Sequence, residues 1–396
     1  MNTKWVKTSL FFFLFVALMG SIMRLTPFID LPVAYKNILH AHSHVAFQGW
    51  VYITLVALII NLYLDKAIVK KYNLQLSLTV ITLIGIMVSF LAQGYALFSI
   101  AFSSLFQFLN YWFTIRFFKD VKKSDLAKKH TFSLKFIKAA LLLMLLSTIG
   151  PWIIGVLSAK GLGDSEYFNA ALYFFFHFQY NGWFTFAVLG IFFWWIENQA
   201  IPIKPSASKF YTYMLIAVVP AYSLSLLGMS FGKYFQLIGY ISAILQLIGA
   251  TYLIMFIKQT YPSIKKTFNQ IVFTLLAISF SCFFIKELLQ AFSSLPALKQ
   301  YAFLNKNLII SYIHLVMIGF ISFFLLAILF QLNWLKPNKL GIALLMLGFM
   351  VSEITLIRLG FSSDSLLQQV MAFFSFIMAL GIALIAIKQL ERKDNL

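Results

Sequence analysis

The chain has 396 residues, of which 61% are hydrophobic and only 11% are charged, and its mean hydropathy is +0.87. Apolar runs of about 20 residues, each long enough to cross the ~30 Å hydrocarbon layer of a membrane, recur along its whole length and exclude a soluble globular protein. The formal net charge of +19 is explained by membrane orientation and anionic lipid, so no nucleic-acid partner is expected.

The apolar runs predict helices. Backbone polar groups inside a membrane must be satisfied internally, and an uninterrupted run such as 10–23 favours a helix over the alternating strands of a barrel. We therefore predict an all-α membrane protein, a bundle of about twelve transmembrane helices. In chain order the predicted spans are 8–26, 41–64, 74–92, 97–117, 136–157, 169–195, 209–229, 234–257, 268–291, 307–332, 339–358 and 366–387.

Two features inside these spans affect their boundaries. The third and fourth spans share one charge-free stretch, which we divide at the turn-prone pair Gln93-Gly94 because the whole stretch is too long for one crossing. Pro151 and Pro220 are expected to kink their helices, since proline lacks the backbone N–H that a helix interior needs.

The distribution of Lys and Arg supports twelve spans. With a cytoplasmic N-terminus, 23 of the 31 basic residues fall in inside segments, and the outside segments hold only Lys36, Lys160, Lys233, Lys299 and Lys306. Cytoplasmic loops are typically enriched in Lys and Arg, so this bias predicts that both termini are cytoplasmic. The expected location is the plasma (inner) membrane of a bacterium, with membrane lipid as a partner.

A short motif, His-x-x-x-x-Gly followed by an aromatic residue, occurs three times, beginning at His44, His177 and His314. The copies are 133 and 137 residues apart, about a third of the chain, and the chain has only six His. We interpret them as an internal triplication within one polytopic domain of residues 1–396, with pseudo-repeats at about 1–133, 134–267 and 268–396. One imidazole per repeat is typical of a protein that holds a metal ion or haem.

The predicted topology places the three histidines in one layer near the outer face, roughly 5–15 Å from it at 1.5 Å per residue. Ionisable residues at helix ends share this layer. Such groups are costly at membrane depth and usually mark a functional site, so a polar pocket is expected in the outer leaflet. The residues concerned are Arg24, Lys286, Glu287, Glu353 and Arg358.

The histidines also have a structural interpretation. His40, His42 and His44 fit the interfacial start of a helix, with His40 and His44 on one face and His42 on another. His177 and His314 fit hydrogen-bonding residues between helices, and the glycines of the motif fit close helix packing.

The charged residues also have a structural interpretation beside the functional one. Arg24 and Arg358 either extend to lipid headgroups or bind an anionic group of a ligand. Lys286, Glu287 and Glu353 either belong to the polar pocket or form structural ion pairs.

Twelve helices in three groups of four, with histidines on the second, sixth and tenth near the outer face, resemble the haem-copper oxidase superfamily, which includes subunit I of terminal oxidases and nitric oxide reductases. The segment LHAHSHVAFQGW (39–50) is also similar to the Trp-His-Ala-His segment of NnrS-type haem and copper proteins. The resemblance implies that His42 or His44 pairs with His314 on a haem iron. It also implies a copper-ligand position for His177 and a role for Arg358 in holding the haem propionates.

The chain departs from the family in two places. The family's tenth helix carries His-x-His, but here Tyr312 stands at the first position and only His314 remains. The family's seventh helix carries a His pair for copper, whereas residues 209–229 contain no His. A complete binuclear centre and proton pumping are therefore not expected.

We therefore expect a haem-binding membrane protein that acts in electron transfer or in handling a diatomic gas such as nitric oxide or oxygen. Copper is a possible second cofactor, and the activity would be that of an oxidase-type oxidoreductase. A redox partner protein or other oxidase-like subunits would be the protein partners. Tyr180, Gln48 and Asn181 are candidate donors that orient the ligands.

Two alternatives remain. One is a transporter of an ion or small anion, with Glu287, Glu353, Arg24 and Arg358 as the coupling charges. The other is a copper- or zinc-binding membrane protein, since neutral imidazole suits iron, copper and zinc alike. Its candidate metal ligands are His40, His44, His177 and His314.

Overall fold

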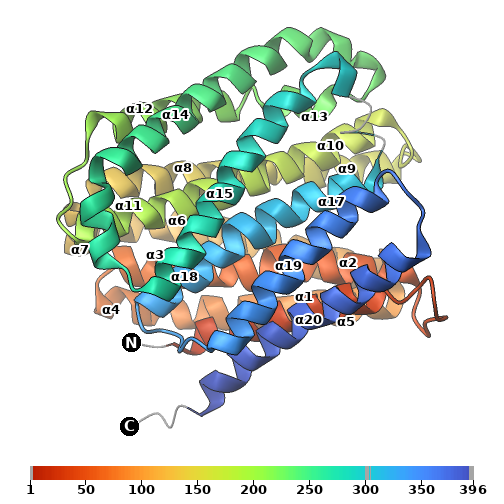
Figure 1. Ribbon diagram of the computed structural model, residues 1–396, viewed down its shortest axis with the longest axis horizontal. Coiled ribbons are helices and arrows are strands. Elements are labelled where there is room, and N and C mark those ends of the chain that lie inside the picture. The colour runs from red at the N-terminus through yellow and green to blue at the C-terminus, as the bar shows by residue number, and fades with distance from the viewer. Residues whose placement is uncertain (1–2, 299–302, 304, 392–396) are drawn as a thin grey trace. The chain divides into compact units, whose positions relative to one another are not determined.

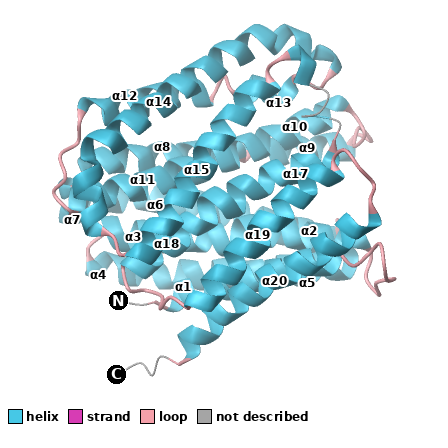
Figure 2. Ribbon diagram, viewed as in Figure 1, coloured by secondary structure: helices cyan, strands magenta, loops and turns pink. Residues whose placement is uncertain are grey.

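The computed structural model describes residues 3–298, 303 and 305–391, and throughout these residues the regular secondary structure is helical, with no strand (Figure 2). Within this described part, nine helices are long and apolar enough to cross a membrane. The chain is therefore an all-helical protein with the character of a multi-pass membrane protein. It folds as two compact units, one of residues 1–120 with 325–396 and one of residues 121–324.

The first unit contains both ends of the chain. Helix α1 (Lys4–Met23) packs against a continuous helix made of α2 (Tyr35–Val45), the π-helical segment η1 (Ala46–Tyr52) and α3 (Ile53–Tyr63). The short α4 (Lys66–Val69) and η2 (Lys70–Tyr72) lead into α5 (Asn73–Gln93), which pairs with α6 (Leu97–Asp120). Helix α19 (Lys339–Leu359) pairs with α20 (Ser365–Leu390), and α20 also packs along α1 (Figure 1).

The second unit begins with η3 (Val121–Lys123) and α7 (Asp125–Lys129). Helices α8 (Thr131–Ser147) and α9 (Ile149–Ala159) pack against the continuous helix of α10 (Glu166–Phe176), the π-helical η4 (His177–Phe184) and α11 (Thr185–Asn198). Helix α12 (Pro205–Val218) packs on α14 (Gln236–Thr267), with α13 (Tyr222–Leu226) and η5 (Ser230–Phe235) between them in sequence. Helix α15 (Gln270–Ser293) packs on the π-helical η6 (Leu315–Ser322), which continues α17 (Lys306–His314) into α18 (Phe323–Gln331), where the boundary between units falls.

The predicted division at Gln93-Gly94 is confirmed. Helix α5 ends at Gln93, and Gly94 has a φ of +64°, a value that a residue with a side chain rarely adopts. A Cβ at this position would also lie only 2.6 Å from Oδ1 of Asn37 on α2. The glycine thus ends α5 and lets the turn before α6 lie against the first turn of α2.

The predicted span over 209–229 is not one continuous helix. Helix α12 ends at Val218, and residues 219–221 form a turn before the short α13. Pro220 has no N–H to continue the helix, so it interrupts the helix where a kink was predicted. Pro151 also stands at an interruption, because α8 ends at Ser147 and Pro151 lies in the first turn of α9, where proline is tolerated.

Two more predicted spans, those at 97–117 and 169–195, are not among the nine described helices that combine the length and the hydropathy of a membrane crossing. Both regions are nevertheless long helices. Helix α6 has 24 residues, and polar residues in its middle such as Gln107 and Asn110 lower its hydropathy. These two side chains are buried in the unit, which explains why polar groups are placed there.

All three copies of the histidine motif coincide with π-helical segments. Gly49 lies in η1, Gly182 in η4 and Gly319 in η6, and each segment packs on the helix that precedes it in its part of the chain, α1, α8 or α15. A Cβ at Gly49 would be 2.8 Å from Cβ of Phe12, and one at Gly182 would be 2.9 Å from Cβ of Leu143. Gly49 and Gly182 therefore allow close approach, as the packing interpretation predicts. π-Helical turns are rare and frequently mark functional sites.

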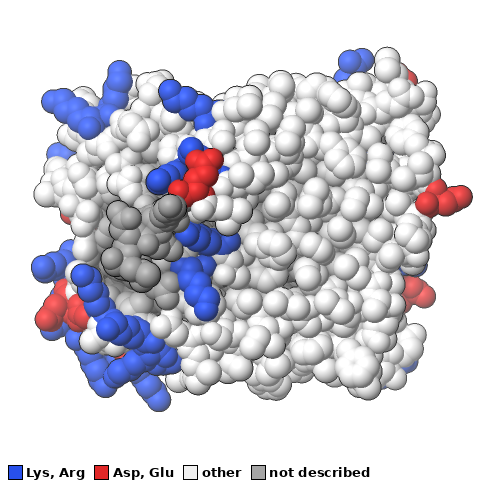
Figure 3. Space-filling model, turned by 90° about the horizontal axis from the view of Figure 1, so that it is seen from below, with Lys and Arg blue, Asp and Glu red and all other residues white. Residues whose placement is uncertain are grey.

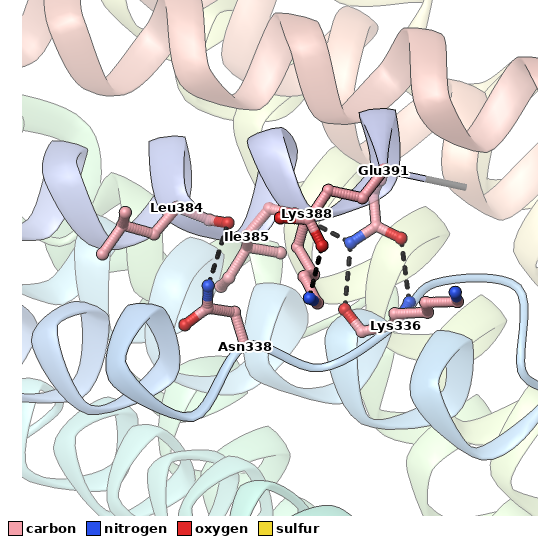
Figure 4. Close-up of polar contacts among 7 residues, drawn as sticks. Lys336, Asn338, Leu384, Ile385, Lys388 and Glu391 are labelled. Atoms are coloured by element: carbon pink, nitrogen blue, oxygen red, sulfur yellow. Dashed lines mark hydrogen bonds and ion pairs between the residues drawn. The ribbon is translucent and has the colours of Figure 1, made fainter. Parts of the chain in front are cut away.

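The connection into α19 is held against α20 by hydrogen bonds between side-chain amides and backbone groups (Figure 4). The side-chain amide of Gln389 accepts from the backbone N–H of Lys336 at 2.8 Å and donates to the carbonyl of the same residue at 2.9 Å. Asn338 donates to the carbonyl of Leu384 at 3.3 Å and caps α19 by accepting from the N–H of Gly341. These bonds satisfy polar groups that a helix end would otherwise leave open.

The surface agrees with a membrane setting. On the face shown in Figure 3, the charged side chains lie mainly at the left of the view, with a few at its right margin, and a broad uncharged region lies between them. Such a region fits contact with lipid chains. Lys299 and the chain ends, residues 1–2 and 392–396, lie outside the described residues, so the predicted topology at these points stays a prediction.

Candidate functional site

The three histidines of α2 point in two directions. The rings of His40 and His44 both lie against Phe90 and Tyr95, whereas His42 lies against α1. This is the arrangement that helical spacing predicts, because residues four apart share a face and the residue between them does not. The histidine cluster therefore forms two separate environments.

His42 is held in one tautomer by α1. Its Nδ1–H donates to the backbone carbonyl of Val16 at 2.8 Å, which leaves Nε2 as the ring nitrogen that carries the lone pair. The ring lies directly over Gly20, since a Cβ there would be 3.0 Å from Cε1 of His42. Imidazoles that bind metals commonly donate their other N–H to a backbone carbonyl, which fixes their orientation.

His44 and His40 surround a tyrosine. Nε2 of His44 and the hydroxyl oxygen of Tyr95 are hydrogen-bonded at 3.0 Å, and the His44 ring stacks on Phe90 with centroids 4.4 Å apart. The His40 ring meets Tyr95 edge to face at 4.5 Å. Sequence reasoning missed Tyr95, although its place directly after the predicted Gln93-Gly94 turn put it at the same end of the unit as α2.

The candidate arginines differ in their surroundings. Arg24 follows the last residue of α1, is half-buried, and interacts electrostatically with the buried carboxylate of Glu353 on α19. Arg358 lies in the last turn of α19 and is exposed. Arg24 therefore interacts with a buried carboxylate. The exposed Arg358 side chain is consistent with one that extends to lipid headgroups at the surface.

His177 is fully engaged inside the second unit. Its Nε2–H donates to the backbone carbonyl of Val218 at 2.7 Å, and its Nδ1 accepts from the side-chain amide of Asn181 at 3.2 Å. The Val218 carbonyl is available because the turn around Pro220 ends α12 and directs the N–H of Tyr222 to Val219 instead. A copper ion would bind His177 only by replacing one of these two bonds.

A buried ion pair lies close to His177 in the same unit. Nζ of Lys286 donates to Oε1 of Glu287 at 2.8 Å, and the two side chains are 0% and 1% exposed. Lys286 interacts electrostatically with His177. Glu287 interacts electrostatically with Tyr312, and Tyr312 also hydrogen-bonds to Asn181. Within the described structure Oε2 of Glu287 is buried without a hydrogen-bond partner. These interactions make His177 part of a polar cluster, a feature that sequence spacing could not reveal.

His314 ends α17, immediately before η6, and is half-buried. Tyr312, one of the family departures, lies beside Tyr180 with ring centroids 6.2 Å apart. Gln48, a candidate orienting donor, is buried in η1, and its Oε1 has no partner among the described residues. Of the three candidate donors, Asn181 therefore has a described hydrogen bond to a candidate histidine, His177, and Tyr180 and Gln48 have none among the described contacts.

No group of three or more His, Cys, Asp or Glu side chains gathers as a metal site within the described residues. The candidate ligands instead occur singly or in pairs, each with a distinct hydrogen-bonding environment. No protein-family model matches this chain, and a search of curated proteins found no relative.

Proposed function

We propose that this chain is a haem-binding membrane protein that acts in electron transfer or in handling a diatomic gas such as nitric oxide or oxygen. The observation that carries the proposal is the environment of His42. Its Nδ1–H bond to Val16 at 2.8 Å selects the tautomer whose Nε2 binds iron. His44 instead contacts Tyr95 and Phe90, away from the α1 face that holds His42.

The residues around His42 fit a haem. Val16 and Gly20 on α1 and Arg24 directly after its end follow one another at intervals of four, so they share one side of the helix. Gly20 lets the imidazole ring lie directly on α1, and Arg24, one turn further, carries a charge suited to a propionate. When bound, the haem would supply the redox-active iron. The protein residues would fix the imidazole and pair the carboxylate, and the pairing with His314 expected from the sequence stays a prediction.

The layout of the chain supports the resemblance to haem-copper oxidases. Each proposed repeat starts with one helix, continues with a helix that contains a π-segment, and ends with a pair of packed helices. The closing pairs are α5 with α6, α12 with α14 and α19 with α20. On this proposal there are twelve membrane helices in three groups of four, with both chain ends in the cytoplasm of a bacterium.

A visible absorbance spectrum tests the proposal. The full-length protein is purified in detergent, supplied with haem, and recorded oxidised and reduced. We expect a Soret band with sharp alpha and beta bands in the wild type, and their loss in His42→Ala. His40→Ala is the matched control, because His40 is on the same helix but faces Tyr95, so it should keep the spectrum.

A colourless wild-type protein after haem supplementation would overturn the proposal. An unchanged spectrum in His42→Ala would remove His42 as the ligand. The same spectrum of His314→Ala separates bis-imidazole ligation from ligation by one histidine, since the bis-imidazole form would lose its sharp bands.

One observation favours a second candidate function, an ion-coupled transporter. The Lys286–Glu287 pair is fully buried, and ionisable groups inside membrane proteins are expensive and commonly serve transport. In that case Glu287→Gln would abolish uptake of a labelled ion or small anion into proteoliposomes, and His42→Ala would leave uptake unchanged. The haem proposal predicts no such uptake.

A further inference from the structure

The end of the first unit where α2 meets the turn between α5 and α6 holds two imidazoles and a phenol in one place. His40 and His44 are one helical turn apart on α2, and both rings contact Tyr95. A pair of histidines at positions i and i+4 of one helix face is the spacing with which helices bind zinc. This face is separate from His42, whose ring lies against α1.

We propose that His40, His44 and Tyr95 form a binding site for a divalent transition-metal ion, with Cu²⁺ bound most tightly. Imidazole suits copper and zinc, and the general order of affinity among divalent first-row ions places Cu²⁺ highest. The site is independent of the haem proposed at His42. It would exist with or without that haem.

The distance between His44 and Tyr95 matches that of two ligands on one metal ion. Their ligand atoms, Nε2 and the phenol oxygen, are 3.0 Å apart. Two atoms that each lie about 2.0–2.1 Å from a metal ion, at an angle of roughly 90–110°, are about 2.8–3.4 Å apart. A metal ion can therefore take the place of the bridging proton with little movement of either side chain.

The chemistry of this replacement is balanced. The metal-free state considered is the one in which the phenolic O–H of Tyr95 donates to Nε2 of His44. Binding of the metal forms bonds to His44 Nε2, to the Tyr95 oxygen and to the His40 imidazole, and releases that proton to water. No electron is transferred, and the phenolate formed offsets one charge of the cation.

The site is held by its surroundings before any metal binds. Phe90 supports the His44 ring from α5 at 4.4 Å. Asn37 fixes the turn that carries Tyr95, because its side-chain amide donates to the carbonyl of Leu91 at 3.3 Å and lies against Gly94. The ligand residues are thus positioned by α2, α5 and one glycine turn, an arrangement that favours binding over a set of mobile side chains.

The site is also accessible. Tyr95 is 59% exposed, and His40 and His44 are half-buried. A cation arriving from the aqueous face predicted to be outside would meet Tyr95 first, and the ammonium of Lys36, one turn before His40, is the charge on α2 that opposes it. The structure therefore provides both an entrance and a defined set of ligands.

Metal titration of the full-length, chelator-treated protein in detergent tests the site. Calorimetry with Cu²⁺, and then with Zn²⁺, is expected to give one equivalent per chain. His40→Ala and His44→Ala should each weaken binding by more than about 100-fold, beyond the 10–100-fold that loss of an outer-shell partner costs. Tyr95→Phe should weaken it about tenfold and remove the phenolate-to-Cu(II) absorption band.

Tyr167→Phe is the matched control. Tyr167 is 67% exposed and stacks on Phe231, a contact that phenylalanine keeps, so this variant should bind Cu²⁺ as the wild type does. Haem spectra of the same samples separate the two proposals, since His40→Ala and His44→Ala should lose the metal ion and keep the haem.

Three results would overturn the inference. One is the absence of stoichiometric binding in the wild type, and another is unchanged binding in either His variant. A third is a wild-type spectrum without the phenolate band together with unchanged affinity in Tyr95→Phe, which would remove Tyr95 from the site.

Discussion

Replacement of Gly20 by Ala tests whether α1 positions the His42 imidazole. A Cβ at Gly20 would lie 3.0 Å from Cε1 of His42 and 3.4 Å from Nδ1. Carbon atoms in favourable contact are about 3.5–4.0 Å apart, so the ring must move by about half an ångström. Because Nδ1 is 2.8 Å from the Val16 carbonyl, this movement stretches and weakens that hydrogen bond.

The expected magnitude combines two opposing effects. Alanine in place of glycine inside a helix stabilises the fold by about 0.8–1 kcal/mol. Weakening one hydrogen bond costs about 0.5–1.5 kcal/mol, so the two effects nearly cancel in the free energy of unfolding. Haem binding does not benefit from the first effect, and loss of an orienting partner is expected to lower haem affinity about 10–100-fold.

Gly155→Ala provides the control, because no atom lies within 4 Å of a Cβ at Gly155 in α9. Thermal unfolding of the haem-free proteins in detergent and titration with haem are measured side by side. Gly155→Ala should raise the melting temperature and bind haem as the wild type does. If Gly20→Ala gains the same stability and keeps its haem affinity, Gly20 does not position His42 and the reasoning is refuted.

Two further predictions concern ionised side chains. Lys286→Met leaves the Glu287 carboxylate buried without its cation and should lower the free energy of unfolding by about 3–5 kcal/mol. The double variant Lys286→Met with Glu287→Leu should recover most of this loss. A Lys286→Met protein as stable as the wild type would contradict this prediction. At the start of α10, the hydroxyl and backbone N–H of Ser230 hold the pKa of the Glu166 carboxyl below its ordinary value. This contact should be fully present above the ordinary Glu pKa of about 4.3 and be lost as the pH falls through the lower folded value, which hydrogen exchange at the Ser230 amide measures. Glu166→Gln should remove this pH dependence, and an unchanged profile would contradict the assignment.

Much of the helical framework could be predicted because its signals are local. The Gln93-Gly94 division follows from the length of one apolar run and the preference of glycine for a positive φ, and the structure has α5 and α6 on either side of it. The predicted span over 209–229 is not one continuous helix, for a related reason. Hydropathy does not register that Pro220 interrupts the hydrogen-bond ladder completely, and whether a proline kinks or ends a helix depends on its neighbours.

The candidate site was predictable only in part. Helical spacing separated His42 from His40 and His44, because the direction of a side chain on a helix follows from its position. The partners of these rings could not be predicted, since Val16 lies on α1, the histidines lie on α2, and Tyr95 lies in the turn after α5. The same holds for His177, whose bond to Val218 depends on a carbonyl released by a distant turn.

By itself the sequence determined that this protein is helical and suited to a membrane, that one histidine motif recurs three times, and which residues of α2 share a face. Composition and periodicity suffice for these features because they arise from each segment alone. Only the tertiary structure decided that each motif copy coincides with a π-helical segment, which tautomer His42 adopts, and which carbonyl His177 meets. These features depend on atoms brought together from separate helices, and packing distances of a few tenths of an ångström decide them.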